Sequence, residues 1–181
     1  MGYGVMSNAV ELVKPSAAYK REYLSFYEDW MSDEQDITPW VVRKDPADFD
    51  SMIEFLYAED TEEKLQNKSF VPHSTYWLID SYSKKVMGAV NIRHRLNEKL
   101  LNSGGHIGYG IRPSERRKGY ASVLLALTLE ITRDMGLNKV LLVCDKGNVA
   151  SEKTILKNGG QFESEYVEEN GNVVRRFWIF L

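Results

Sequence analysis

Residues 106–136 read HIGYGIRPSERRKGYASVLLALTLEITRDMG, and the rest of the chain can be interpreted as support for this stretch. Its beginning, His106–Ile111, alternates glycine with apolar residues as a strand does, and Pro113 ends the strand because proline cannot donate to a sheet ladder. A basic turn containing Gly119 follows, and then an apolar pattern with helical spacing that Gly136 stops. The sequence therefore predicts a strand, a turn and the start of a helix.

This order of elements is typical of an anion site. The first amides of a helix have no intrahelical partner, and the helix dipole places partial positive charge at that end. Gly119 lets the backbone bend close to a ligand, while Arg116, Arg117 and Lys118 add full charges. We interpret the turn as a cradle for a phosphate or pyrophosphate; the alternative is a solvated turn with three surface cations. The glycine spacings of a P-loop and of a dinucleotide fingerprint are both missing.

The turn and a later segment resemble the acetyl-CoA motifs of the GNAT family of N-acetyltransferases. The family signature, Gln/Arg-x-x-Gly-x-Gly/Ala, is matched by Arg116, Gly119 and Ala121, after a strand that contains Tyr109-Gly110-Ile111. The later motif is matched by Asn148-x-x-Ser151 and the Lys-Asn-Gly-Gly that follows it. The N-terminal third of the chain matches the family only in its order of elements.

The resemblance implies a role for each of these residues with acetyl-CoA. Tyr109, Gly110 and Ile111 would pair with the pantetheine arm through free backbone groups, and an amide there would polarise the thioester carbonyl. Asn148 and Ser151 would contact the cofactor from the second motif, or else simply cap a helix. The turn would hold the pyrophosphate, mostly through backbone amides; its residues are Arg116, Arg117, Lys118, Gly119, Tyr120, Ala121 and Ser122.

Acetylation of an amine needs the neutral amine, and a lysine-like amine has a pKa of about 10.4, so a base or a water relay is useful. His106 is our first candidate, because period-two alternation places it on the same strand face as Gly108 and Gly110. The alternative is that this histidine is structural. Glu98 and Glu115 are further candidates, both expected at the solvent.

The proton donor for the departing thiolate is left open by the sequence. The GNAT family often has a tyrosine seven residues after the asparagine of its second motif, and Ile155 stands there instead. Tyr109, Tyr120 or water would have to replace that tyrosine, and we name Tyr109 as a catalytic candidate. Cys144 is not expected to carry the acetyl group, because it lies in an apolar strand without an activating base.

The resemblance predicts an acetyl-CoA-dependent N-acetyltransferase that transfers the acetyl group directly to a primary amine, on a small molecule or a peptide. The missing tyrosine slightly favours the alternative, a non-catalytic domain that binds or senses acetyl-CoA or CoA. Many members of the family lack that tyrosine, so the enzyme stays our first interpretation. Binding of RNA phosphate by the basic turn is a third interpretation. It is opposed by the net charge of −3 and by the lack of an aromatic and basic platform.

Composition indicates one globular domain, which we place at residues 9–181. The single cysteine, Cys144, excludes an internal disulfide and suits a reducing compartment, so we expect a cytoplasmic protein. No apolar stretch has membrane-spanning length, and we expect neither a membrane partner nor a metal. Residues 1–8 do not have the pattern of a signal peptide and could be disordered or a remnant of expression. A homodimer is compatible with the sequence, although no residue predicts it.

The predicted order is strand, two helices, three strands, helix, strand, helix and two strands. This is an α/β fold with a central mixed, mostly antiparallel sheet and helices on both faces, and the GNAT resemblance implies the same. The first helix begins at Ser16 and has a core-facing aromatic stripe, the second spans about residues 46–66, and Trp40 lies in the loop between them. The helix that begins at Tyr120 is expected to bury Tyr120, Val123, Leu124, Leu127, Ile131 and Met135.

Overall fold

The computed structural model describes residues 9–181, so the expectation for residues 1–8 lies outside the described part of the chain. These residues form four α-helices: α1 (Lys20–Met31), α2 (Phe49–Tyr57), α3 (Tyr120–Asp134) and α4 (Val149–Lys157). The same described part of the chain contains seven strands: β1 (Val10–Val13), β2 (His73–Asp80), β3 (Val86–Arg93), β4 (Ile107–Ile111), β5 (Lys139–Asp145), β6 (Gln161–Val167) and β7 (Val173–Phe180). The order of elements along the chain is the predicted one.

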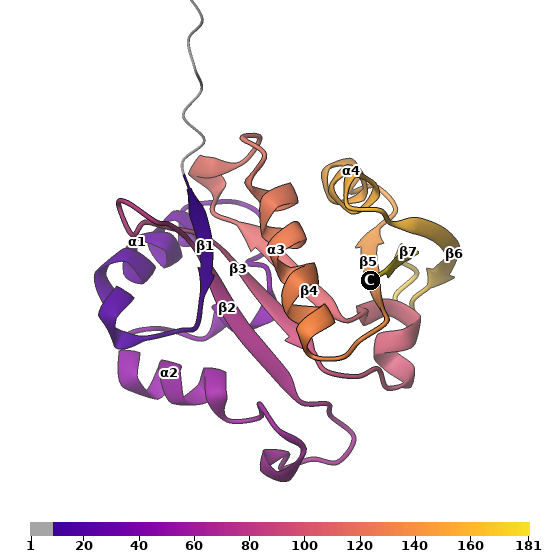
Figure 1. Ribbon diagram of the computed structural model, residues 1–181, viewed down its shortest axis with the longest axis horizontal. Coiled ribbons are helices and arrows are strands. Elements are labelled where there is room, and N and C mark those ends of the chain that lie inside the picture. Colours follow the sequence, from indigo (N-terminus) through magenta and orange to yellow (C-terminus); the bar gives the residue numbers. More distant parts are fainter. Residues whose placement is uncertain (1–8) are drawn as a thin grey trace, which may run out of the picture.

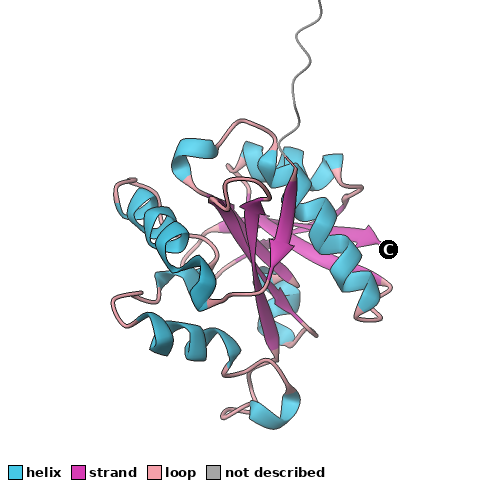
Figure 2. Ribbon diagram, turned by 60° about the vertical axis from the view of Figure 1, so that its left-hand side comes forward, coloured by secondary structure: helices cyan, strands magenta, loops and turns pink. Residues whose placement is uncertain are grey.

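The strands form two antiparallel sheets, with orders β1-β2-β3-β4 and β5-β7-β6. Helices α1 and α2 cover one face of the first sheet, and α3 covers the other (Figures 1 and 2). Consecutive residues of β2 show this alternation, because Trp77 and Ile79 pack with α1 and α2, whereas Leu78 packs with α3. The predicted fold class is confirmed. The prediction of one central sheet with some parallel pairing was wrong in detail. Within residues 9–181 there are two sheets, and every pairing of strands in them is antiparallel.

The aromatic stripe of the first helix is core, as predicted. Ser16 caps a short 3-10 turn that leads into α1, by accepting a hydrogen bond from the amide of Ala18. Tyr23, Phe26 and Trp30 are buried. The ring of Tyr23 stacks on that of Trp77 in β2, with centroids 4.3 Å apart.

The prediction of a second helix over residues 46–66 was wrong at both ends. Helix α2 begins only after Asp48, whose carboxylate accepts a hydrogen bond from the amide of Ser51. It ends at Tyr57, and a separate 3-10 turn follows at Glu62–Lys64. A run of charged residues continued the helical appearance of the sequence, but it has no apolar face with which to pack.

The buried face of α3 also differs from the prediction. Val123 and Met135 are exposed, and only Leu124 of the predicted set is fully buried. The other buried residues of the helix are Leu125, Thr128, Leu129 and Thr132. Both threonine hydroxyls donate to backbone carbonyls of the preceding turn, and these bonds compensate for their burial. Polar residues at helical spacing therefore concealed part of the core-facing stripe.

None of the helices within residues 9–181 is long and apolar enough to cross a membrane.

Candidate active site

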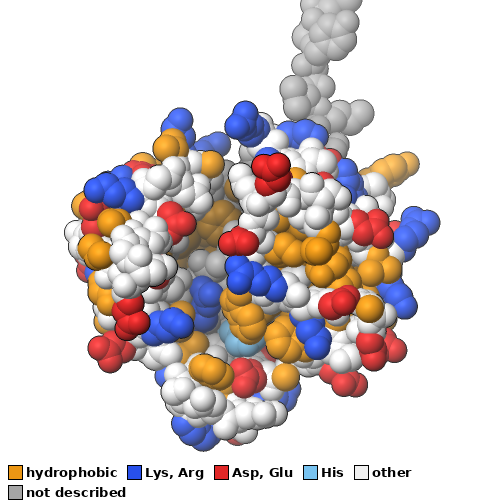
Figure 3. Space-filling model, turned by 180° about the vertical axis from the view of Figure 1, so that it is seen from behind, with side chains coloured by type: hydrophobic (Ala, Val, Ile, Leu, Met, Phe, Trp, Pro, Cys, Tyr) orange, Lys and Arg blue, Asp and Glu red, His pale blue; other side chains and the backbone are white. Residues whose placement is uncertain are grey.

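A cavity of about 550 Å³ lies where β4, the N-terminus of α3 and helix α4 meet. Its walls also include the end of α1 and the loop that follows it, through Trp30, Gln35, Asp36 and Thr38. The surface seen from behind is hollowed between the lobe of α4, β6 and β7 and the rest of the molecule, with apolar side chains at its floor (Figure 3). The volume is in the range of small-molecule binding sites.

Most of the site residues predicted from the sequence line this one cavity. They are Tyr109, Gly110, Ile111, Arg116, Arg117, Gly119, Tyr120, Ala121, Ser122, Asn148 and Ser151. His106 and Lys118 are not among the lining residues. Sequence reasoning missed the wall from the first loop, and it gave no role at the site to two further cations, Lys153 and Lys157. The spacing of these two lysines, one helical turn apart on α4, was the available signal for them.

The basic turn is built as a helix N-terminus open to the cavity. Gly119 has φ +87°, a left-handed conformation that glycine adopts without strain, and no atom lies within 4 Å of where its Cβ would be. The first hydrogen bond of α3 runs from the amide of Val123 to the carbonyl of Gly119. The amides of Tyr120, Ala121 and Ser122 consequently have no intrahelical acceptor and are available to an anion.

The positive charges at the turn are not equivalent. Arg116 binds Asp33 at 2.7 Å and lies over the ring of Trp30, 4.7 Å from its centroid, so its charge is largely neutralised. Lys118 is paired with Glu115 at 2.8 Å. Among residues 9–181, Arg117 and the two cavity lysines of α4 make no ion pair. These three cations are therefore the ones free to meet a bound anion.

Strand β4 has a free edge at the cavity. The residues that flank it, His106 and Arg112, are hydrogen-bonded to β3, at 2.7 Å and 2.9 Å. Bonded residues alternate along an antiparallel ladder, so Gly108 and Gly110 direct their backbone groups to β3. Tyr109 directs its own N–H and C=O to the opposite edge, where β4 has no strand partner within residues 9–181. An extended ligand can pair with this edge.

The hydroxyl of Tyr109 reaches across from β4 to α4. It lies 3.1 Å from the hydroxyl of Ser151, near the N-terminus of that helix. Burial raises the pKa of Tyr109, and the hydrogen bond with Ser151 lowers it less than burial raises it. The side chain is thus protonated at neutral pH and able to donate a proton at the cavity wall. Asn148 caps α4 by accepting a bond from the Ser151 amide at 3.0 Å, which is the alternative role considered for it.

The other candidates for proton transfer lie in different surroundings. Ile155 is fully buried in the main core and does not reach the cavity surface. Glu115 lines the cavity and its side chain is 12% exposed, so the expectation that it lies at the solvent was wrong. It accepts from Lys85 and Lys118, and although burial raises its pKa, these bonds hold the pKa below its ordinary value. Glu98 lies at a separate hollow beside the turn between β6 and β7. Burial raises the pKa of Cys144 to about 11, so its thiol stays protonated.

His106 is held between two strands. It is 6% exposed, and its Nδ1 accepts a hydrogen bond of 2.8 Å from the amide of Leu141 in β5. Burial, together with the nearby charge of Arg93, lowers its pKa to about 4. The lone pair that a base would use is therefore occupied by a backbone donor.

The loop after α1 touches the strand at Gly110. A Cβ at this position would lie 2.1 Å from the carbonyl oxygen of Thr38 and 3.1 Å from the ring of Trp30. On this face of the strand, the protein's own loop approaches the backbone at Gly110. Gly110 consequently fixes where the loop wall of the cavity stands.

Replacing Gly110 with Ala is expected to lower the free energy of unfolding by about 1–3 kcal/mol, because the loop must move to admit the methyl group. The matched control is Gly108→Ala on the same face of the same strand, where the nearest atom to a Cβ is 3.4 Å away. That control should be neutral or stabilise by up to about 1 kcal/mol. Urea denaturation measures both, and equal effects of the two substitutions would contradict the role given to Gly110.

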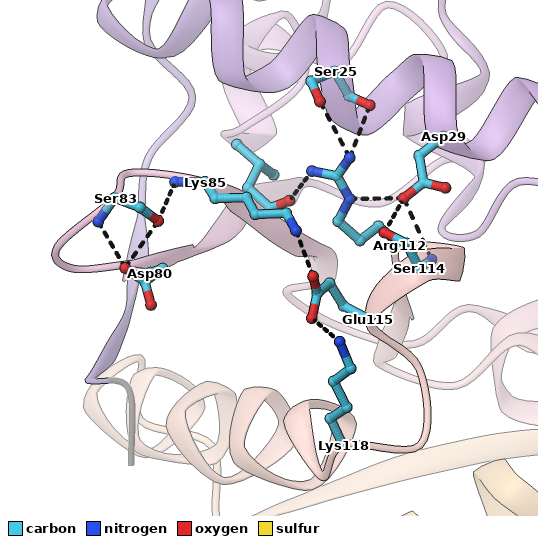
Figure 4. A network of polar contacts seen from close by, with 10 residues as sticks. Ser25, Asp29, Asp80, Ser83, Lys85, Arg112, Ser114, Glu115 and Lys118 are labelled. Carbon is cyan, nitrogen blue, oxygen red and sulfur yellow. Dashed lines mark hydrogen bonds and ion pairs between the residues drawn. The ribbon is translucent and has the colours of Figure 1, made fainter. Parts of the chain in front are cut away.

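A buried ion pair ties the turn to α1 (Figure 4). The guanidinium of Arg112 donates to Asp29 at 2.8 Å and to the carbonyl of Ser25 at 3.1 Å. Ser114, at the start of the turn, also donates to Asp29 through its hydroxyl, at 2.5 Å. Asp29 is thus paired with Arg112, as Asp33 is with Arg116, so neither carboxylate is free to attract a cation.

Comparison with known proteins agrees with this geometry. Residues 10–161 match the family described as acetyltransferase (GNAT) domain. The structure is similar to a chimera of spermidine N-acetyltransferase SpeG from Vibrio cholerae and hSSAT, at 17% identity and a TM-score of 0.62, over 94% of this chain and 95% of that one. It is also similar to a putative ribosomal-protein-serine acetyltransferase from Vibrio cholerae, at 16% identity and a TM-score of 0.64, over 98% and 97% of the two chains.

Among curated proteins, none matches this chain. The two similar structures are so distant in sequence that they establish the fold alone, whereas the family match spans most of the chain. This family match assigns the chain to the acyltransferases, and the open helix N-terminus and the free strand edge agree with the assignment. The protein belongs to the GNAT family of acetyltransferases, acyltransferases that use acetyl-CoA as co-substrate.

Proposed function

We propose that this protein binds acetyl-CoA in the 550 Å³ cavity and transfers the acetyl group directly to a primary amine. The observation that carries the proposal is the continuity of two unsatisfied backbone regions in one cavity. The free edge of β4 at Tyr109 leads to the open amides at the start of α3. A pantetheine arm needs the first region, and a pyrophosphate needs the second.

The residues present fit such a ligand. The amides of Tyr120, Ala121 and Ser122 would hold the pyrophosphate, with Gly119 leaving room for it. Arg117 and the two cavity lysines of α4 would add charge, since their cations have no acidic partner among residues 9–181. Arg116 would act indirectly, by holding the turn against Trp30 and Asp33. Lys118 lies outside the cavity and is not retained in this set.

The thioester supplies an activated acetyl group, and the chain supplies proton transfer and orientation. The amine nitrogen forms a bond to the carbonyl carbon while the carbon–sulfur bond breaks, so the amine loses a proton and the sulfur gains one. Tyr109 would give its phenolic proton to the departing sulfur and regain it through Ser151 or solvent. This tyrosine would supply from β4 the hydroxyl that Ile155 cannot supply from α4.

Removal of the amine proton is assigned to water in the cavity. His106 is not retained as the base, because its Nδ1 is already bonded to Leu141. Glu115 is not retained either, since both its oxygens are paired with lysines. An amine with a pKa of about 10.4 is mostly protonated at neutral pH, and only its small neutral fraction reacts. Water is sufficient to take the proton that this neutral amine releases as the amide forms.

For the acceptor we propose a cationic amine that approaches past the loop after α1. Asp36 lines the cavity there, and it and Glu34 make no ion pair among residues 9–181. Several of the similar structures bear the name of spermidine, among them a dodecameric spermidine N-acetyltransferase from Vibrio cholerae at 19% identity and a TM-score of 0.61, over 94% of this chain and 93% of that one. A polyamine or an exposed peptide amine carries the charge that this loop would attract.

The expected setting follows from the same chemistry. A cytoplasmic protein would have both acetyl-CoA and small amines at hand, and the single cysteine suits a reducing compartment. The excess of acidic residues disfavours a nucleic-acid partner. Self-association into a dimer or a larger oligomer is compatible with the dodecamer among the similar structures.

Release of free CoA thiol tests the proposed function. The protein is incubated with acetyl-CoA and a panel of amines: polyamines, amino acids, aminoglycosides, and peptides with a free N-terminus or a lysine. Thiol release that depends on both the enzyme and one class of amine, with the acetylated product seen by mass spectrometry, is the expected result. Tight binding of acetyl-CoA without turnover of any amine would support the sensing alternative instead.

A further inference from the structure

His106, which immediately precedes β4, and Leu141, near the start of β5, are joined by a reciprocal pair of hydrogen bonds. The amide of His106 donates to the carbonyl of Leu141 at 2.7 Å. In return, the amide of Leu141 donates to Nδ1 of the His106 ring at 2.8 Å. A side chain thus completes a contact between two strands that form no ladder with each other.

Several neighbours fix this junction. Gly105 has φ +68°, and a Cβ there would lie 2.6 Å from the carbonyl oxygen of Leu141, so only glycine permits the approach. The guanidinium of Arg93 donates to the carbonyls of Gly104 and Gly105, at 3.3 Å and 3.5 Å. The ring of Trp178 in β7 packs edge-on against the ring of His106, with centroids 6.4 Å apart.

Beyond the junction the two strands diverge around the cavity. The residues that flank β5 bond to the two ends of β7: Asn138 accepts from Leu181, which follows β7, and Lys146 donates to Val173, at 2.9 Å each. By alternation, Leu141 and Val143 direct their backbone groups away from β7, toward β4. Leu141 is bonded to His106, whereas the backbone of Tyr109 faces an open gap roughly 10 Å further along its strand.

We propose that His106 is a positioning residue for acetyl transfer, which fixes the angle at which β4 leaves β5 and thereby the width of the gap beside Tyr109. This inference rests on the proposed function, because the gap is where the pantetheine arm would lie. His106 acts through its bond to Leu141 and not by accepting a proton from the amine. Its tautomer follows from the geometry, since a ring nitrogen that accepts from an amide carries no proton, and the proton sits on Nε2.

The electrostatic surroundings agree with that role. Burial and Arg93 lower the pKa of His106 to about 4, so the ring is neutral at physiological pH and the bond from Leu141 is present. A base of this strength would accept a proton from an ammonium group poorly.

The substitution His106→Asn separates position from basicity. The Oδ1 atom of asparagine is as many bonds from Cα as Nδ1 of histidine, so it can accept the Leu141 bond, yet asparagine cannot act as a base. His106→Ala removes both properties. We expect kcat/KM of His106→Asn within about threefold of wild type, and that of His106→Ala lower by roughly 10²-fold, as for a displacement of about 1 Å.

Hydrogen exchange of the Leu141 amide supplies a readout that does not depend on turnover. The amide should be protected in the wild type and in His106→Asn, and exchange faster in His106→Ala. If His106→Ala does not fold, the comparison of wild type with His106→Asn alone decides. Loss of kcat in a folded His106→Asn that still binds acetyl-CoA would indicate that His106 acts as the general base, and it would overturn the proposal.

Wild-type activity in a folded His106→Ala would overturn the proposal as well, because the bond between His106 and Leu141 would then have no effect on acetyl transfer. Failure of the proposed function has a different signature: the wild type itself would turn over no amine. In that case protection of Leu141 and the affinity for acetyl-CoA, measured on the same three proteins, still test whether His106 sets the gap.

Discussion

Replacing Tyr109 with Phe is expected to lower kcat by about 10²-fold while leaving the affinity for acetyl-CoA within about threefold of wild type. The substitution removes the hydroxyl that lies 3.1 Å from Ser151 and keeps the ring that packs in the core. The departing thiolate would then take its proton from water. Because the backbone of Tyr109 is unchanged, the free strand edge that would pair with pantetheine is kept. Thiol release gives kcat, and calorimetric titration gives the affinity.

Tyr120→Phe is the matched control for this substitution. Tyr120 lines the same cavity from the first turn of α3 and was the other tyrosine considered as a proton donor. Its loss is expected to change kcat by less than about threefold. A large loss with Tyr120→Phe and none with Tyr109→Phe would move the proton donor to α3. No effect of either substitution would assign this proton to solvent.

Replacing Arg112 with Met is expected to lower the free energy of unfolding by about 3 kcal/mol. Arg112 is 5% exposed, and its removal leaves Asp29 in a half-buried place without its counterion (Figure 4). The cost arises from the unpaired carboxylate and the lost bonds to α1, because a charge taken out of water must be compensated. Urea denaturation measures the change.

The pH dependence of this difference provides an internal check. In the wild type, burial raises the pKa of Asp29, but hydrogen bonds from Ser114 and Arg112 outweigh it, so the pKa lies below its ordinary value of 3.8. The folded-state pKa is depressed, so the stabilisation is complete above the unfolded value and is lost as pH falls through the folded value. The difference in the free energy of unfolding between the wild type and Arg112→Met should therefore become smaller below about pH 4.

Lys146→Met is the control for a solvated ion pair. Lys146 is paired with Glu165 at 2.9 Å, and both side chains are substantially exposed. Its loss should cost less than about 1 kcal/mol at any pH. An effect of Arg112→Met as small as that of the control would contradict the role of the buried pair in holding the turn to α1.

Local patterns in the sequence predicted the order of the elements, and they also indicate the anion site, which stays a prediction. Glycine and proline mark the ends of β4, the cap at Asn148 starts α4, and the left-handed Gly171 turns β6 into β7. The turn from Arg116 to Ser122 was predicted because its chemistry lies in consecutive residues.

What the sequence could not reveal depends on contacts between distant segments. The neutralisation of Arg116 by Asp33 joins residues far apart in the chain, as does the approach of Thr38 to Gly110. No local pattern shows that the lone pair of His106 is taken by Leu141. Such contacts decide which of several plausible side chains are free for chemistry, and periodicity reports only on neighbours along one element.

The most direct test of the account is a calorimetric titration with acetyl-CoA on three proteins: the wild type, Gly119→Trp and Gly136→Trp. Gly119 and Gly136 stand at opposite ends of α3, with φ +87° and +85°, and neither has an atom within 4 Å of its Cβ position. The two substitutions therefore impose similar backbone strain, but only the first fills the cavity.

We predict one acetyl-CoA bound per chain with equal affinity in the wild type and Gly136→Trp, and no detectable binding in a folded Gly119→Trp. Absence of binding by the folded wild type, or undiminished binding by Gly119→Trp, would contradict the assignment of this cavity to acetyl-CoA.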